Sequence, residues 1–184
     1  MPAAVTRSAL DDGLLFRGPE FRRLTAEEFL DAVWQITGTG PKSPAGNLGV
    51  APAPFTDATP PARRLVRAAL VTADPLMRSL GRPNREQVVT TRPDQLTTLQ
   101  ALDLTNGAIL TDTLSRGAAN ILKDTTGASP DRLADLVYRR ALGRAPTAGE
   151  LSVARDLLGP APSADTLADL LWSVVMLPEF QIIR

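Results

Sequence analysis

The sequence predicts an all-α protein, with five to seven helices in a compact bundle, a long Pro/Gly-rich loop and an irregular N-terminal arm. Apolar residues recur at helical spacing in most segments, and no segment shows the strict alternation that marks a half-buried strand. Capping residues stand before several of these segments, and Gly or Pro stands after them. The length of 184 residues fits one such domain.

The first predicted helix begins at Thr25, after an arm over residues 1–24 that shows little periodicity. Thr25 and Glu28 have the spacing of a capping box, in which each side chain accepts a hydrogen bond from the other residue's backbone amide. Apolar residues then recur at helical spacing as far as Trp34, and Gly38 ends the helix.

Pro and Gly recur throughout residues 38–62, which predicts a long loop, because Pro lacks an amide donor and Gly loses the most backbone entropy. A short amphipathic helix is predicted over 63–72, and Pro75 is expected to interrupt it. The apolar stripe then continues to Gly81, where a turn is expected.

A further helix is predicted to start at Pro93-Asp94, with Leu99 and Leu102 on its apolar stripe. Asn106-Gly107 has the character of a C-cap or of a kink, and the pattern leaves both open. The helical spacing over 109–122 therefore indicates either a second helix or the same helix bent at the glycine.

Three more helices are predicted in the C-terminal half, over 131–142, 148–158 and 165–177. Ser129-Pro130 caps the first, a second capping box precedes the next, and Pro178 is expected to stop the last. Their short connections predict that they pack as antiparallel neighbours.

We expect two parts, an arm at 1–24 and a single helical domain at 25–184 that contains the 38–62 loop. The chain has no Cys and no His, which excludes disulfides, thiol nucleophiles, zinc fingers, Ser-His-Asp triads and histidine-ligated haem. We therefore expect no cofactor and no metal, and the composition leans against enzymatic activity of this chain alone.

The balance of 20 basic and 20 acidic residues and a pI near 6.3 argue against nucleic acid as a partner. No stretch reaches the roughly 20 apolar residues that a membrane span requires, so no span is expected. The N-terminus also lacks the pattern of a signal peptide.

Arg82, Arg85 and Arg92 form the candidate binding site. They surround a Gly-Pro turn and a predicted helix start, where guanidinium groups and backbone amides together suit an anion. The structural alternative is that these arginines pair with local acids such as Glu86 and Asp94.

Two acid pairs stand four residues apart, Asp131 with Asp135 and Asp165 with Asp169. Both pairs fall in predicted first turns, where the helix dipole favours carboxylates, so a structural role explains them. Trp34 and Trp172 lie on apolar helix faces and are interpreted as core anchors, with sugar stacking as the alternative for an exposed ring.

Four stretches together resemble the C-terminal part of a known family, the planctomycete-type, cytochrome-c-associated domain of unknown function, family 1553. They are LTAEEFLDAVWQIT at 24–37, SLGRPNRE at 79–86 with TTLQAL at 97–102 and Asn106-Gly107, YRRALGRAPTAGE at 138–150, and DLLW at 169–172 with Glu179-Phe180. The resemblance spans about residues 20–184.

The resemblance implies a larger exported parent protein, because family members usually carry an N-terminal haem-c domain and a second uncharacterised domain. The chain would then be the C-terminal fragment of such a protein, found in the periplasm or at the cell surface. The family provides no assigned catalytic residue to transfer.

Three function hypotheses follow, and the third of them is an electron-transfer accessory that docks a haem domain and contributes only surface to it. The first is a helical module that packs against upstream domains of its parent protein or binds a protein partner. The second is an accessory domain that binds an anionic or sulfated sugar in polysaccharide use, through the three arginines named above.

Overall fold

The structure is a computed structural model that describes residues 21–41, 67–83 and 97–183. Within these ranges the chain forms eight α-helices, one 3-10 helix and a two-stranded sheet, which confirms the all-α class. Six of these helices have nine residues or more. Most of the predicted arm and of the 38–62 loop lies outside the described residues.

The elements follow one another in this order: β1 (Arg22–Arg23), α1 (Ala26–Thr37), η3 (Ala68–Leu70), α2 (Pro75–Ser79), α3 (Thr98–Asn106), α4 (Ala108–Asp124), α5 (Pro130–Leu142), α6 (Ala148–Leu158), α7 (Ala164–Val175), α8 (Pro178–Gln181) and β2 (Ile182–Ile183).

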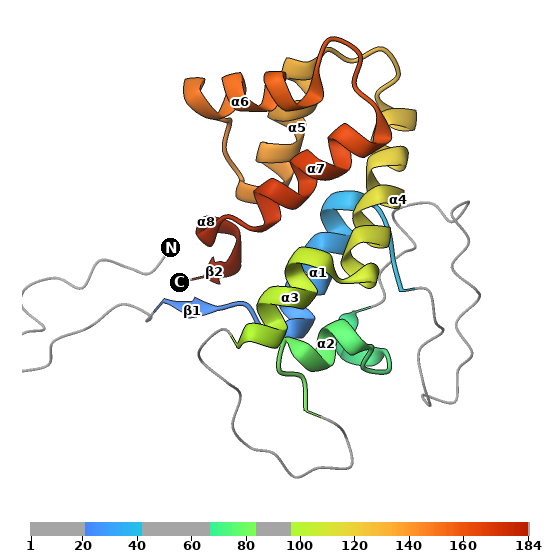
Figure 1. Cartoon of the computed structure of the whole chain (residues 1–184), viewed down its shortest axis with the longest axis vertical. Helices are drawn as coiled ribbons and strands as arrows, with labels where there is room; N and C mark the ends of the chain where they lie inside the picture. The colour runs from blue at the N-terminus through green and yellow to red at the C-terminus, as the bar shows by residue number, and fades with distance from the viewer. Residues whose placement is uncertain (1–20, 42–66, 84–96, 184) are drawn as a thin grey trace, which may run out of the picture.

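Helix α4 connects two groups of helices. Figure 1 shows α5, α6 and α7 above α1, α2 and α3, with α4 alongside both groups. Helix α4 packs against α7, α1 and α3, and α5, α6 and α7 pack against one another. The predicted packing of the three C-terminal helices as neighbours therefore holds.

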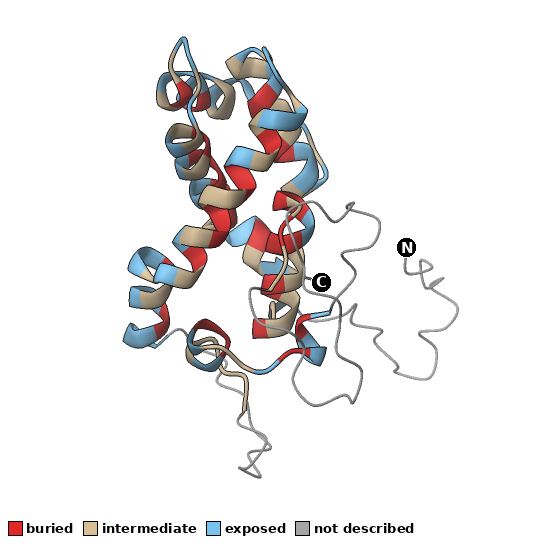
Figure 2. Cartoon of the chain, turned by 90° about the vertical axis from the view of Figure 1, so that its right-hand side faces the viewer, coloured by how far each residue is buried: buried red, intermediate tan, exposed pale blue. Residues whose placement is uncertain are grey.

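The core lies on the inner faces of these helices, where buried residues face neighbouring helices and exposed residues face outward (Figure 2). Helix α1 contributes Phe29, Leu30, Val33 and Trp34, each at most 8% exposed. The ring of Phe29 meets the ring of Phe180 edge to face, with the centroids 5.8 Å apart, a favoured geometry for aromatic pairs. This contact joins the first helix to the last one.

The two-stranded sheet was not predicted. Strand β1 pairs antiparallel with β2, with Arg22 opposite Ile183 and Arg23 opposite Ile182. The Leu24 amide also donates to the Gln181 carbonyl at 2.8 Å. Two residues per strand are too few to leave an alternating pattern in the sequence.

Local capping signals predicted several helix ends correctly. Thr25 and Glu28 form their capping box at the start of α1, and Gly38 ends that helix with a left-handed φ of 62°. A second capping box starts α6 at Thr147, and Ser129 caps α5.

Two prolines start helices that the sequence analysis did not predict. Pro75 was expected to interrupt a helix, but it is the first residue of α2. Pro178 was expected to stop the last helix, and α7 does end before it, at Val175, but Pro178 also starts the short helix α8. Proline fits this position because its fixed φ suits a helix and its missing amide would have no intrahelical partner. Asp74 supplies the cap of α2 by accepting a hydrogen bond from the Met77 amide at 2.7 Å.

Two further boundaries differ from the predictions. Within the described part of 63–72 the chain forms only the 3-10 turn η3, whose cap makes no side-chain hydrogen bond. Helix α3 begins at Thr98, where Thr97 and Gln100 form a capping box, and the predicted start at Pro93-Asp94 lies outside the described residues. Gly107 separates two helices, as the C-cap of α3 and the N-cap of α4.

Candidate functional site

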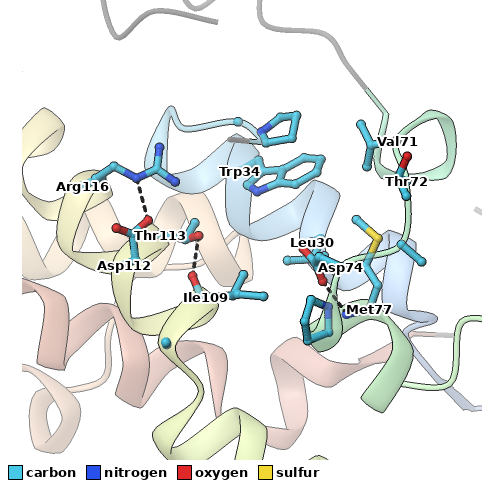
Figure 3. A pocket seen from close by; sticks show the side chains of 15 residues that line it. Leu30, Trp34, Val71, Thr72, Asp74, Met77, Ile109, Asp112, Thr113 and Arg116 are labelled. Carbon is cyan, nitrogen blue, oxygen red and sulfur yellow. Dashed lines mark hydrogen bonds and ion pairs between the residues drawn. The ribbon is translucent and has the colours of Figure 1, made fainter. Parts of the chain in front are cut away.

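An apolar pocket of about 490 Å³ lies between α1, the 71–75 segment and α4. Figure 3 shows Trp34 between two walls, with Asp112 and Arg116 on one side and Val71 and Met77 on the other. Leu30 and Trp34 stand one turn apart on α1, so both reach the same pocket.

The polar groups of this pocket are mostly engaged in local bonds. Arg116 donates through Nε to the Asp112 carboxylate at 2.9 Å, and the Thr113 hydroxyl donates to the Ile109 carbonyl at 2.7 Å. The carboxylate of Asp74 is held by its capping bond. The indole N–H of Trp34 makes no hydrogen bond within the described part of the chain.

A second hollow of about 440 Å³ lies where α3, α4 and α7 meet. Its wall carries hydroxyl and carboxylate groups and the ring of Trp172, over the buried side chain of Leu114. The polar lining comes from Thr105, Thr111, Ser115, Asp165 and Asp169.

Trp172 is not the buried anchor that the sequence predicted. The residue is 36% exposed, and its indole N–H donates to the Leu104 carbonyl at 2.9 Å. That carbonyl belongs to the last turn of α3, where backbone acceptors have no partner within the helix. Trp172 therefore fixes the end of α3 while part of its ring faces solvent. Trp34, in contrast, is only 8% exposed, as expected for a core residue.

The two acid pairs of the sequence differ in their surroundings. Asp131 pairs with Arg155, and Asp135 pairs with Arg139 at 2.8 Å. The carboxylates of Asp165 and Asp169 have no cation or hydrogen-bond donor among the described residues. The helix dipole and the bound arginines thus explain Asp131 and Asp135 fully. For Asp165 and Asp169 the helix dipole alone is left, which explains them only in part.

Arg82 is the one candidate anion-binding arginine that the structure describes, and it holds protein groups. It donates to the Ala68 carbonyl at 2.7 Å and to the Ala69 carbonyl at 3.0 Å, and its Nε lies 3.5 Å from the Glu27 carboxylate. Its side chain is 10% exposed. Arg85 and Arg92 lie outside the described residues.

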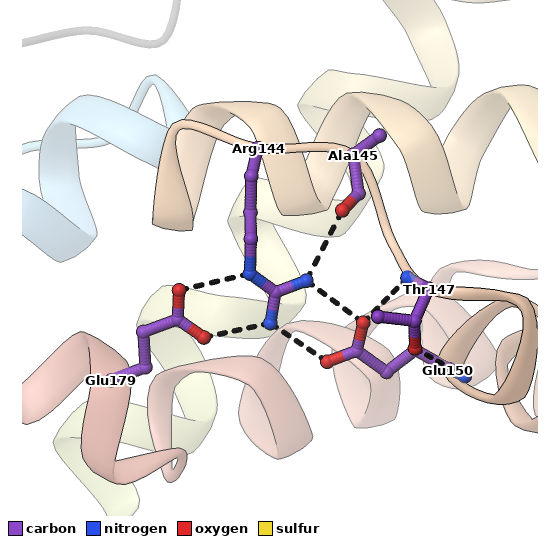
Figure 4. Close-up of polar contacts among 5 residues, drawn as sticks. All are labelled: Arg144, Ala145, Thr147, Glu150 and Glu179. Atoms are coloured by element: carbon purple, nitrogen blue, oxygen red, sulfur yellow. Dashed lines mark hydrogen bonds and ion pairs between the residues drawn. The ribbon is translucent and has the colours of Figure 1, made fainter.

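Arg144 forms an ion network that sequence analysis missed (Figure 4). Its guanidinium binds the carboxylates of Glu150 and Glu179 with four hydrogen bonds of 2.7–2.9 Å. This hydrogen bonding lowers the pKa of Glu150 to about 2 and lowers the pKa of Glu179, and both carboxylates raise the pKa of Arg144. Glu150 was visible in the sequence as a capping residue, but no local signal connects Arg144 with Glu179, which stands 35 residues later.

Arg144 also lies 5.7 Å from the ring centroid of Tyr138, in cation–π range. The network thus clamps the α5–α6 turn to α8. We interpret it as a structural clamp, because every charged group in it already has its partner.

No cluster of three or more metal-ligating side chains is present in residues 21–41, 67–83 and 97–183. Among the helices of these ranges, none is both long and apolar enough to cross a membrane.

A model of the PSD1 family, described as a protein of unknown function (DUF1553), matches residues 3–158. The chain belongs to the PSD1 family. This confirms the resemblance that the four stretches indicated. No curated protein and no solved structure matched the chain.

The PSD1 match and the four stretches cover different extents. The matched region begins within the predicted arm and ends at Leu158, the last residue of α6. The stretches at 24–37, 79–107 and 138–150 lie inside it, whereas DLLW and Glu179-Phe180 lie beyond it. Contacts nevertheless connect the matched region with the residues that follow it, because Phe29 packs on Phe180 and Arg144 binds Glu179.

Proposed function

We propose that this PSD1-family chain is a helical module that binds a protein partner or a neighbouring domain of a larger parent protein, through one face of α3 and α7. We call this surface the α3–α7 face. It consists of Leu99, Leu102 and Thr105 on α3 and Asp165, Asp169 and Trp172 on α7.

The observation that carries the proposal is the exposure of large apolar side chains on this face. Leu99 is 60% exposed, Leu102 is 55% exposed and Trp172 is 36% exposed. These two leucines were expected to face the core, but α3 buries Gln100 and Leu104 instead. Apolar groups gathered on a surface are typical of binding interfaces.

The spacing of these residues supports a continuous surface. Leu99, Leu102 and Thr105 stand three residues apart, so they follow one side of α3. Thr105 reaches the hollow that Trp172 lines, and the indole bond to the Leu104 carbonyl holds α7 against α3. The apolar stripe of α3 therefore leads into the hollow beside Trp172.

The experiment that tests this proposal is site-specific photo-crosslinking in the native host. A photoreactive amino acid replaces Leu102, and a matched variant carries it at Val153, which is 68% exposed on α6. We expect a defined crosslinked partner from position 102 and none from position 153. The purified partner should then bind the unmodified chain at least about tenfold more tightly than the Leu102→Asp variant.

Equal crosslinking at both positions, or equal affinity of the purified partner for Leu102→Asp, would contradict the proposal. Leu102→Asp changes an exposed residue, so the variant is expected to fold. Far-ultraviolet circular dichroism and a urea melt check this point.

The second candidate function is the binding of an anionic or sulfated sugar. Arg82 is engaged by the Ala68 and Ala69 carbonyls, so the pocket of Figure 3 offers a better cation, Arg116. Arg116 donates to Asp112 through Nε, and it faces the indole N–H of Trp34 across the pocket, a donor that has no acceptor among the described residues. Both groups are donors, which suits a sulfate or carboxylate carried on a sugar ring.

A thermal-shift screen tests this second candidate with sulfated and neutral oligosaccharides, sulfate and phosphate. A ligand that binds only the folded state raises Tm. Stabilisation by sulfated sugar that is lost in Arg116→Gln but kept in Arg139→Gln would support sugar binding. An unchanged Tm across the panel would rule it out.

A further inference from the structure

The α3–α7 face is acidic as well as apolar. The carboxylates of Asp165 and Asp169 line the hollow beside Trp172 and have no cation among the described residues. Neither α3 nor α7 contains a Lys or Arg, and no basic residue lines the hollow. The whole chain is neutral, so this negative charge is local.

Many other acids of the fold have an arginine at their carboxylate, whereas the two aspartates of this face have none among the described residues. Asp112, Asp131, Asp135 and Glu28 each have an arginine at their carboxylate. Two carboxylates four residues apart on one helix repel each other when no cation lies near them, and a bound cation would relieve this repulsion.

Trp172 and the hydroxyl groups of the hollow fit the same kind of ligand. Asp165, Asp169 and Trp172 stand at helical spacing on one side of α7, and the exposed ring offers an aromatic face to a cation. The Thr105 hydroxyl donates to the Ala101 carbonyl at 2.7 Å, which leaves its oxygen as an acceptor for an incoming donor. The volume of about 440 Å³ admits an arginine or lysine side chain.

We infer that the partner of the α3–α7 face is a basic amphipathic protein segment. Its apolar residues lie on Leu99 and Leu102, and an arginine or lysine enters the hollow between Trp172 and the carboxylates of Asp165 and Asp169. This inference rests on the proposed function and adds the charge of the partner. An anionic ligand is disfavoured at this face, because it would meet two carboxylates and no cation.

Nuclear magnetic resonance of the full chain tests this inference with designed peptides. Three peptides of one amphipathic helical pattern carry Arg, Gln or Glu at the same positions, and a neutral oligosaccharide serves as a fourth probe. The chain has two tryptophans, so the indole N–H signal of Trp172 reports the hollow and that of Trp34 is an internal control.

We expect the arginine peptide to shift the Trp172 indole signal and leave the Trp34 signal in place. Its apparent affinity should fall at least about tenfold in the Asp165→Asn/Asp169→Asn double variant, and it should fall at high salt, because screening weakens exposed charge pairs. The matched control is Asp156→Asn, which removes an exposed carboxylate of α6 and should bind the peptide unchanged.

Three outcomes would overturn the inference: no shift of the Trp172 signal, equal binding of the Arg and Gln peptides, or a Trp172 shift caused by the oligosaccharide alone. The proposed function fails separately. If Leu102→Asp abolishes binding of the crosslinked partner while Asp165→Asn/Asp169→Asn leaves it intact, the interface stands and the basic segment is wrong. If Leu102→Asp has no effect, the interface itself is wrong.

Discussion

Gly117 of α4 lies directly against Thr37 of α1, and a Cβ placed on this glycine would stand 2.3 Å from the Cβ of Thr37. Thr37 is 1% exposed, and its hydroxyl donates to the Val33 carbonyl at 2.6 Å, so it has no free space to move into. This contact sets how closely α1 approaches the central helix.

Gly117→Ala should therefore lower the free energy of unfolding by about 1–3 kcal/mol, as overpacking of a filled interface does. The matched control is Gly149→Ala on α6, where nothing lies within 4 Å of the added Cβ. Because alanine favours helix over glycine, this control should stabilise the chain by about 0.5–1 kcal/mol. Urea melts measure both values, and equal effects of the two variants would contradict the packing argument.

The ion network of Arg144 predicts a loss of stability in acid. Glu150 has a pKa of about 2 in the folded chain, against its usual value of 4.5. A carboxyl with a lowered folded-state pKa stabilises the fold above its unfolded pKa and loses this effect as pH falls. The free energy of unfolding should thus decrease as pH is lowered from about 4.5 to about 2.

Arg144→Gln should make the free energy of unfolding decrease less steeply as pH falls, because the pKa of Glu150 then returns toward its usual value. Some loss of stability at low pH should remain, since Arg22 also lowers the pKa of Glu28 to about 2. Arg139→Gln is the control, because it breaks an exposed pair with Asp135 on one helix and leaves Arg144 alone. Chemical unfolding at a series of pH values measures the slope, and an unchanged slope in Arg144→Gln would contradict the prediction.

The two tryptophans should respond differently to truncation. Trp34→Ala removes a side chain that is 8% exposed and should cost about 3–5 kcal/mol. Trp172→Ala removes a partly exposed ring and the donor to the Leu104 carbonyl, so it should cost only about 1–2 kcal/mol. Urea melts that gave equal losses would mean that the Trp172 ring is buried.

Arg82 should act as a structural residue in the described fold. Arg82→Gln removes the donors to the Ala68 and Ala69 carbonyls and should lower the free energy of unfolding by about 1–3 kcal/mol. Arg78→Gln on α2, an exposed residue with one long bond to the Asp74 carbonyl, should change it by less than about 0.5 kcal/mol. A neutral effect of Arg82→Gln, seen in thermal and urea melts, would mean that these bonds contribute little.

Local chemistry explains which parts of the fold could be predicted. The capping boxes at Thr25 and Thr147 act within four residues, so the sequence contains the whole signal. The helices that start at Pro75 and Pro178 were missed because a proline can end one helix and also start the next, and the outcome depends on what the following residues pack against.

The α3–α7 face, in contrast, could not be predicted from the sequence. Leu99 and Leu102 have the spacing of a core stripe, yet α3 turns them outward because its amphipathic pattern is weak and its buried side holds Gln100 and Leu104. The exposure of Trp172 depends on its bond to Leu104, 68 residues away. Spacing along the chain cannot reveal contacts of this kind, so the sequence placed the candidate site at the arginines and not at the α3–α7 face.

The pairing of β1 with β2 determines when folding during synthesis can finish. Arg23 binds Gln181, which stands 158 residues later, and Phe29 cannot make its ring contact before Phe180 has been synthesised. A ribosome that has released α1 must still produce every other helix before these partners exist, and the last of them are made only as α8 and β2 are translated. Until then the apolar side of α1 lacks its final cover, so the emerging chain exposes apolar surface, and needs protection from aggregation, until α8 and β2 have been made.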